Sequence, residues 1–275
     1  MRFVVMLSSR DEKPRGGGTD YDPLAIENVP ASMVVKERIF DDYALILNKF
    51  PAFRGHALLA SLDPIDQAAR LTKWDLDALH RCATAAKALG FYNSHDVAGS
   101  SQVHRHFQLV PVDSIAAVVG RRNFFFPGIF DQVHELPREF WRWSSKTPFF
   151  PVVRRLPALH GVAHGLVQLP RRATFDIDFA RDGGFADALL RSYVALATDL
   201  GILGDVQEAP HNILLSEAWI LVVKRAKATA RGVAVNGLAF AAILLARDAD
   251  VFDALVRDRR PLSVLRDVSA APPPP

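Results

Sequence analysis

The sequence predicts an α+β fold in which an antiparallel sheet packs against helices. Two apolar runs of strand length flank a loop that contains Pro51 and Gly55, an amphipathic helix follows, and further extended segments come after it. Links of hairpin length favour antiparallel pairing, and an amphipathic helix needs a sheet face to cover. The chain has 275 residues, 49% of them apolar, which is enough for a substantial core.

The first predicted hairpin pairs residues 43–48 with residues 56–61, which both have the pattern of short apolar strands. A helix is expected to begin after Thr72, because an acidic residue three positions later completes a variant capping box. Apolar residues keep helical spacing as far as Leu89, and Gly90 is a natural stop.

The second half of the chain is harder to interpret because prolines interrupt it. Aromatic residues cluster over residues 124–130 and 141–143, where buried strands fit better than a lid over a base pocket. The remaining expectations are a helix over 185–200, a strand pair over 211–216 and 219–224, and helices over 234–245 and 251–256.

The most informative segment covers residues 99–111. In it, His104, His106 and Gln108 occupy every second position. An extended segment has a period of two, so both imidazoles and the amide should share one face. A loop of small residues, 98–101, comes just before them and is called the serine loop here. Its backbone N–H groups suit an anion, and an imidazole beside a phosphate is the chemistry of nucleotidyl transfer.

Other interpretations of the histidines stay open. Two histidines two apart on a strand are more often surface residues or satisfied core residues, and they can also be metal ligands. Gln108 is a poor third ligand for such a metal. His160 and His164 have the spacing of one helical face, but the glutamate of the zinc-protease pattern is missing between them.

Composition limits the expected partners. The formal net charge of +3 is too small to indicate nucleic acid and is compatible with polyanionic small molecules. No apolar run reaches about 20 residues, so neither a membrane helix nor a membrane partner is expected. Cys82, the single cysteine, cannot form an internal disulfide, which favours a cytoplasmic location.

These motifs resemble the ATP adenylyltransferase (diadenosine tetraphosphate phosphorylase) family, a branch of the histidine triad (HIT) superfamily. The resemblance is carried by residues 47–51, 55–59, 91–94, 98–108, 212–215, 219–223 and 236–240. It implies a HIT-like catalytic domain over residues 1–155. A C-terminal α+β domain over residues 156–275 would complete the pocket. Composition, and not the resemblance, predicts a disordered proline-rich tail at 270–275.

The resemblance also implies roles for individual residues. His106 would be the nucleophile that attacks the α-phosphorus of a bound nucleotide, His104 would support it and touch the phosphates, and Gln108 would hold a phosphate or leaving oxygen. The implied substrate-binding residues are Asn48 for the ribose, Asn93 and Lys49 for phosphate, and Gly99, Ser100 and Ser101 for the non-reacting phosphates. His56 is assigned a structural role.

The implied reaction converts diadenosine tetraphosphate and phosphate into ATP and ADP through a covalent nucleotidyl-histidine. No tightly bound cofactor is expected, and Mg²⁺ would enter only with the substrate phosphates. Two alternatives remain: a uridylyltransferase-like enzyme or phosphorylase acting on a nucleoside diphosphate-sugar, and a non-catalytic nucleotide-binding module. His95 stands where the family has a glycine, which is expected to reshape the phosphate-binding loop.

Overall fold

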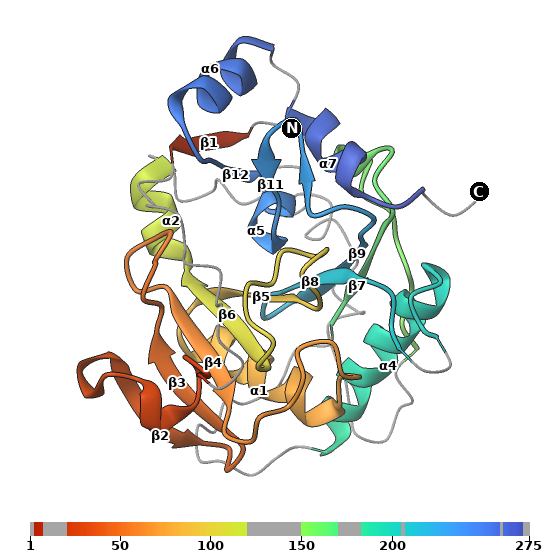
Figure 1. The fold of residues 1–275 in the computed structure, drawn as a ribbon. Coiled ribbons are helices and arrows are strands. Elements are labelled where there is room, and N and C mark those ends of the chain that lie inside the picture. The colour runs from red at the N-terminus through yellow and green to blue at the C-terminus, as the bar shows by residue number, and fades with distance from the viewer. Residues whose placement is uncertain are drawn as a thin grey trace.

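The computed structural model describes residues 3–7, 21–119, 150–169, 183–204, 207–258 and 261–271. Their central element is an eight-stranded antiparallel sheet in the order β2-β3-β4-β6-β5-β8-β9-β7 (Figure 1). Its strands are β2 (Val34–Ile39), β3 (Tyr43–Leu47), β4 (Ala57–Ser61), β5 (Ala88–Asn93), β6 (His106–Pro111), β7 (His164–Gln168), β8 (His211–Leu215) and β9 (Trp219–Lys224). The predicted α+β class is confirmed.

The remaining elements surround this sheet. Two small sheets pair β1 (Val4–Leu7) with β12 (Ile243–Ala246) and β10 (Thr229–Ala230) with β11 (Val233–Ala234). The helices are α1 (Lys73–Ala85), α2 (Val112–Val119), α4 (Gly183–Asp199), α5 (Gly237–Phe240), α6 (Ala249–Asp258) and α7 (Pro261–Val268), with short 3₁₀ turns at Ile26–Asn28, Ala31–Met33 and Pro157–Leu159. In Figure 1, α5, α6 and α7 gather with β1 and β12 at one end of the molecule. None of the helices in the described ranges has the length and apolarity needed to cross a membrane.

The two faces of the large sheet carry different cores. On one face, α1 and α4 cover apolar side chains of β4, β5, β6, β8 and β9, such as Leu59, Phe107 and Ile213. On the other face, a small cluster of β3 and β4 residues packs under Leu24, and a larger cluster around Phe91 packs under the C-terminal elements. The alternation of buried side chains along each strand produces both faces.

A polar strip separates the two apolar clusters on this second face. It consists of His106 and Gln108 of β6, Asn93 of β5 and Asn212 of β8. The register aligns Gln108 with Phe91, and Asn93 with Asn212, so these four polar side chains share one side of the pleat. Because β5 pairs with β8, strands from the two predicted domains, 1–155 and 156–275, belong to one continuous sheet.

Several predicted elements are confirmed. The hairpin of β3 and β4 forms, and the strand pair of β8 and β9 and the helices α4 and α6 lie at the predicted positions. Thr72 caps α1: its Oγ1 accepts the N–H of Asp75 at 3.2 Å, and the Asp75 carboxylate accepts the Thr72 N–H at 2.6 Å. The aromatic clusters at 124–130 and 141–143 lie outside the described residues.

The prediction that Gly90 stops a helix is wrong. Helix α1 ends at Ala85, and Leu89 and Gly90 belong to β5. Lys87 has a φ of +47°, in the left-handed region, which reverses the chain between the helix and the strand. A Cβ on Gly90 would lie 2.9 Å from Cδ1 of Leu79. The glycine therefore allows close packing of α1 on β5.

The predicted helix over 234–245 is also wrong. Only Gly237–Phe240 is helical, Ala242 has a φ of +61°, and Ile243–Ala246 forms β12 in parallel with β1. A short apolar run has no periodicity that distinguishes a buried strand from a buried helix. The strand partner from the other end of the chain decides between them.

Candidate active site

His106 is the first residue of β6 and belongs to the polar strip. Its side chain is buried, and its Nδ1 lies 2.9 Å from the carbonyl oxygen of His104. A carbonyl oxygen can only accept a hydrogen bond, so Nδ1 carries the proton of the neutral ring and Nε2 keeps its lone pair. This tautomer of imidazole is the one that can act as a nucleophile at Nε2.

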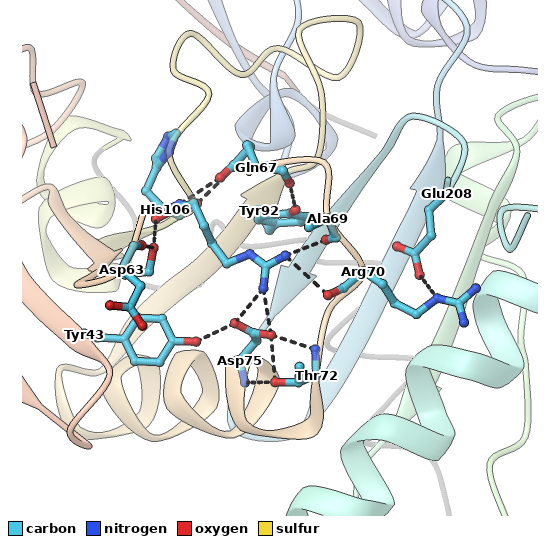
Figure 2. Close-up of polar contacts among 12 residues, drawn as sticks. Tyr43, Asp63, Gln67, Ala69, Arg70, Thr72, Asp75, Tyr92, His106 and Glu208 are labelled. Carbon is cyan, nitrogen blue, oxygen red and sulfur yellow. Dashed lines mark hydrogen bonds and ion pairs between the residues drawn. The ribbon is translucent and has the colours of Figure 1, made fainter. Parts of the chain in front are cut away.

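Gln67, from the loop between β4 and α1, fixes the main chain of His106. Its Oε1 accepts the His106 N–H at 2.7 Å, and its Nε2 donates to the carbonyl oxygens of His106 at 3.1 Å and Asn93 at 2.8 Å. The pairing of β5 with β6 ends at Phe91 and Gln108, so the Gln67 amide replaces the next inter-strand hydrogen bonds, between Asn93 and His106. Figure 2 shows Gln67 between His106 and Tyr92, whose hydroxyl donates to the Gln67 carbonyl oxygen.

Arg105 holds the segment between the two histidines from behind. Its guanidinium donates to both carboxylate oxygens of Asp75, at 3.2 and 3.1 Å, and to the carbonyl oxygen of Ala69 at 2.6 Å. The Tyr43 hydroxyl donates to the same carboxylate (Figure 2). Arg105 and Asp75 are both buried. Because neighbouring side chains in an extended segment point in opposite directions, this anchor turns the flanking histidines away from α1.

His104 has partners for both ring nitrogens inside the protein. Its Nδ1 contacts the carboxylate of Asp22, and its Nε2 lies 2.7 Å from the carbonyl oxygen of Ser61. Both ring nitrogens of His104 therefore face protein oxygens. The contact ties the segment around Asp22 to the sheet, next to Leu24, which covers the small apolar cluster of β3 and β4.

Gln108 lies two residues after His106 and contacts a third histidine. Its Oε1 is 3.0 Å from Nε2 of His56, which is 3% exposed. The N–H of Ala52 donates to Nδ1 of His56 at 3.3 Å. The side-chain nitrogen of Asn48 lies 3.3 and 3.4 Å from the two ring nitrogens, so the Asn48 amide rests against this ring.

Asn93 contributes an amide with one unused end. Its Oδ1 accepts from Nδ2 of Asn212 at 2.8 Å and from the N–H of Gly237 at 2.9 Å. Its own Nδ2 is buried and has no hydrogen-bond partner among the described residues. A buried donor without a partner costs about 1–3 kcal/mol, so an anionic ligand oxygen at this position would be favourable.

The serine loop packs against the C-terminal half of the chain. Gly99 has a φ of +92°, and a Cβ there would lie 2.6 Å from the carbonyl oxygen of Val235. The Ser100 hydroxyl donates to the Gln102 carbonyl oxygen at 2.9 Å, and Ser101 is exposed. The glycine is therefore needed both for the turn and for the close approach of the two backbones.

Arg225 lies beneath the serine loop. Its Nη1 donates to the carbonyl oxygen of Ala98 at 3.2 Å and to Oδ1 of Asn212 at 2.7 Å. Its Nη2 donates to the carbonyl oxygens of Lys227 at 2.7 Å and Val235 at 3.0 Å. All four acceptors are neutral, and burial lowers the pKa of Arg225 to about 10, so the side chain stays charged at neutral pH. A buried positive charge thus lies under the loop.

A second buried polar cluster adjoins the start of β8. The Tyr193 hydroxyl lies 2.6 Å from Oε2 of Glu208 and 3.1 Å from Nε2 of His211. Burial raises the pKa of Glu208 and lowers the pKa of His211 to about 4. The backbone N–H of His211 donates to Oγ of Ser94 at 2.9 Å, which links this cluster to the segment that leads into the serine loop.

Lys49 and His164, which the sequence also singled out, do not belong to the polar strip. Lys49 is exposed, and its ammonium lies 5.8 Å from the centroid of the Phe50 ring. His164 lies in β7 and not in a helix, and its ring nitrogens bond the main chain at Leu156 and Val162. In the part of the chain that the structure describes, no three His, Cys, Asp or Glu side chains form a group that could hold a metal ion.

Two family models match the chain in succession. Residues 12–119 match the Ap4A phosphorylase N-terminal domain, and residues 156–271 match the ATP adenylyltransferase C-terminal domain. The chain belongs to the ATP adenylyltransferase (Ap4A phosphorylase) family. Members of this family are nucleotidyltransferases, so the predicted enzyme class is confirmed. Its place in the wider HIT superfamily stays a prediction.

Relatives of known identity come from Saccharomyces cerevisiae. Diadenosine 5',5'''-P1,P4-tetraphosphate phosphorylase 2 is 27% identical over 263 residues, which cover 86% of this chain and 72% of the relative. Protein APA1 is 24% identical over 272 residues, covering 91% and 77%. The crystal structure of yeast Ap4A phosphorylase Apa2 has a TM-score of 0.69 at 24% identity, covering 93% of this chain and 83% of that chain. Its complex with AMP has a TM-score of 0.69 at 25% identity, covering 91% and 80%.

Sequence analysis missed three residues of this family member's site: Gln67, Asn212 and Arg225. Asn212 begins a block that carries the family resemblance, and Arg225 follows another one closely. Both positions could have been found from that signal. Gln67 lies in a loop with no recognisable motif around it, and only its contacts reveal its role.

Proposed function

We propose that this protein cleaves diadenosine tetraphosphate by phosphorolysis, with His106 as the covalent nucleophile. The observation that carries the proposal is the 2.9 Å contact from Nδ1 of His106 to the His104 carbonyl oxygen, which leaves Nε2 unprotonated. Gln108 and Asn93 lie on the same side of the sheet and offer amide groups beside the nucleophile. The family membership and the named activity of the yeast relative support the same substrate class.

In the first step, Nε2 of His106 attacks the α-phosphorus of the bound substrate. A P–N bond forms while the bond between the α-phosphorus and the oxygen that links it to the next phosphorus breaks, and ATP leaves with that electron pair. In the second step, an oxygen of inorganic phosphate attacks the same phosphorus, the P–N bond breaks, and ADP leaves. The nucleophile is regenerated neutral, and one difficult displacement becomes two easier ones.

The other residues position the phosphates. The orphaned Nδ2 of Asn93 would donate to a phosphate oxygen, and Ser100 and Ser101 with the backbone of Gly99 would hold the non-reacting phosphates. The buried charge of Arg225 would favour a polyanion over the serine loop. Stabilising the equatorial oxygens in this way is the main source of catalysis in phosphoryl-type transfer.

His104 acts as a support in this proposal. Because its nitrogens face Asp22 and Ser61, we assign it to holding the segment before His106 and not to binding phosphate. Asn48 would contact the ribose, and Lys49 could reach the phosphate chain only from the surface of its loop.

Magnesium would enter on the substrate phosphates. The polar strip offers three amides, one imidazole and no carboxylate, which is a poor set of ligands for this hard cation. We also propose a cytoplasmic location, since Cys82, the single cysteine, is buried and unpaired.

A labelling experiment tests the proposal. The protein is mixed with diadenosine tetraphosphate labelled on both α-phosphates, without phosphate, and acid-labile label on the protein is measured. The wild type should retain label, and His106→Ala should lose it together with about a 10³-fold or greater fall in turnover. His160→Ala, at an exposed histidine directly after a 3₁₀ turn, is the matched control. Normal turnover by His106→Ala would refute the assignment.

The acceptor separates the remaining alternatives. Adding phosphate to the labelled protein should release ADP. Release only by a hexose 1-phosphate would instead favour the nucleoside diphosphate-sugar reaction, and release as AMP would indicate hydrolysis. Tight nucleotide binding without any label would favour a non-catalytic binding module.

A further inference from the structure

The tautomer of His56 follows from its main-chain contact, because the Asn48 side-chain nitrogen lies almost equally far from both ring nitrogens, at 3.4 Å from Nδ1 and 3.3 Å from Nε2. The Ala52 N–H points at its Nδ1, and a backbone N–H can only donate, so Nδ1 must accept. The proton of the neutral ring is therefore on Nε2. That nitrogen lies 3.0 Å from the Gln108 side-chain oxygen, to which it donates.

This donation fixes the direction of the Gln108 amide. An amide group has an oxygen end and an NH₂ end of nearly equal size, and only its hydrogen bonds decide which end points where. With Oε1 engaged by His56, the NH₂ end of Gln108 is the end left to face a substrate. The reversed amide would turn its oxygen toward the anionic phosphate oxygens and repel them.

We propose that His56 is a positioning residue that presents the NH₂ group of Gln108 to the reacting phosphate. The inference rests on the proposed function of His106 and extends it to a residue that the sequence indicated to be merely structural. His56 does not touch the substrate in this proposal. It acts through Gln108, with the Ala52 N–H holding its ring in the required tautomer.

The loop between β3 and β4 is part of the arrangement. The His56 N–H donates to the Phe53 carbonyl oxygen at 3.1 Å, and the His56 carbonyl oxygen accepts the Asn48 N–H at 2.9 Å. These bonds hold the backbone of His56 opposite Asn48, at the start of the loop. The position of the ring beside Gln108 of β6, 52 residues later, is therefore fixed by the main chain.

Substitutions of His56 test the proposal by single-turnover labelling of the protein. His56→Phe keeps the ring shape and removes the donor, and it should slow labelling by about 10²-fold with a small change in KM. His56→Gln can place an amide N–H near the former Nε2 and should recover most of the rate. His56→Asn is too short to do so and should stay slow. His80→Phe, at a buried histidine on α1, is the matched control.

A double-mutant cycle separates positioning from a structural role. Gln108→Met should slow labelling about as much as His56→Phe, and His56→Phe should add nothing in the Gln108→Met background. Thermal unfolding of each variant shows whether it is folded. If His56→Phe is too unstable to assay, the contrast between His56→Gln and His56→Asn decides the question.

The outcomes distinguish this inference from the proposed function. If the wild type becomes labelled and a folded His56→Phe variant is labelled at the same rate, the inference alone is overturned. It is also overturned if the double variant slows labelling by the product of the two single-variant factors. A folded wild type that binds nucleotide and never becomes labelled would overturn both. Equal rates for His56→Gln and His56→Asn would also contradict the role of the donor.

Discussion

Replacing Gln67 by methionine should loosen the nucleophile without touching it. Gln67→Met keeps the length of the side chain and removes three buried hydrogen bonds, two to the backbone of His106 and one to Asn93. At about 1 kcal/mol net for each bond, the free energy of unfolding should fall by about 3 kcal/mol. For a chain of this size, the loss corresponds to about 6–12 °C in Tm.

The catalytic effect of Gln67→Met should be larger than a loss of stability explains. A displacement of about 1 Å at a reacting atom can cost about 10²-fold in rate, so kcat should fall by about that factor at a temperature where the variant is fully folded. Calorimetry and steady-state kinetics measure the two effects. Gln168→Met is the matched control: this residue lies in β7, and its Nε2 has no hydrogen-bond partner among the described residues. A fully active Gln67→Met variant would show that the hydrogen bonds of Gln67 are not needed to position His106.

Three further substitutions have defined expectations. Gly99→Ala should lower the free energy of unfolding, measured by urea denaturation, by more than about 2 kcal/mol, because it combines a positive φ with a clash against the backbone. Gly201→Ala is the control and should lower this free energy less, because a Cβ there meets only the end of a lysine side chain at 3.4 Å. Burial lowers the pKa of His211 to about 4 in the folded protein. As the pH falls, His211 is therefore protonated in the unfolded protein before it is protonated in the folded protein, and stability falls between about pH 6.5 and pH 4. The free energy of unfolding should fall by about 2 kcal/mol between pH 7 and pH 5 from this cause. Glu208 has the opposite effect on stability, so the His211 contribution is measured as the difference in the free energy of unfolding between wild type and His211→Gln at each pH. Parallel curves of stability against pH for the two proteins would contradict this expectation. Arg225→Met should raise KM for diadenosine tetraphosphate about tenfold or more, and an unchanged KM at low salt would show that the buried charge does not reach the substrate.

Local sequence determined the parts of the site that depend on backbone period alone. The alternation of His104, Arg105 and His106 places the charged residue and the imidazoles on opposite sides of an extended segment, and the structure has this arrangement. The capping residues at Thr72 and the hairpin of β3 and β4 follow from interactions between residues close in the chain. Such interactions survive in almost any fold that contains the segment.

Tertiary structure alone decided which groups surround the nucleophile. Gln67 reaches His106 across 39 residues and His56 reaches Gln108 across 52, and no local pattern encodes either contact. The same holds for Gly90 and for Ile243–Ala246, where a helix packed on a strand and a strand partner near the N-terminus override the local preference. The physical reason is that a buried polar or apolar group takes whichever partner the packed chain brings to it, and that partner is known only once the whole sheet is assembled.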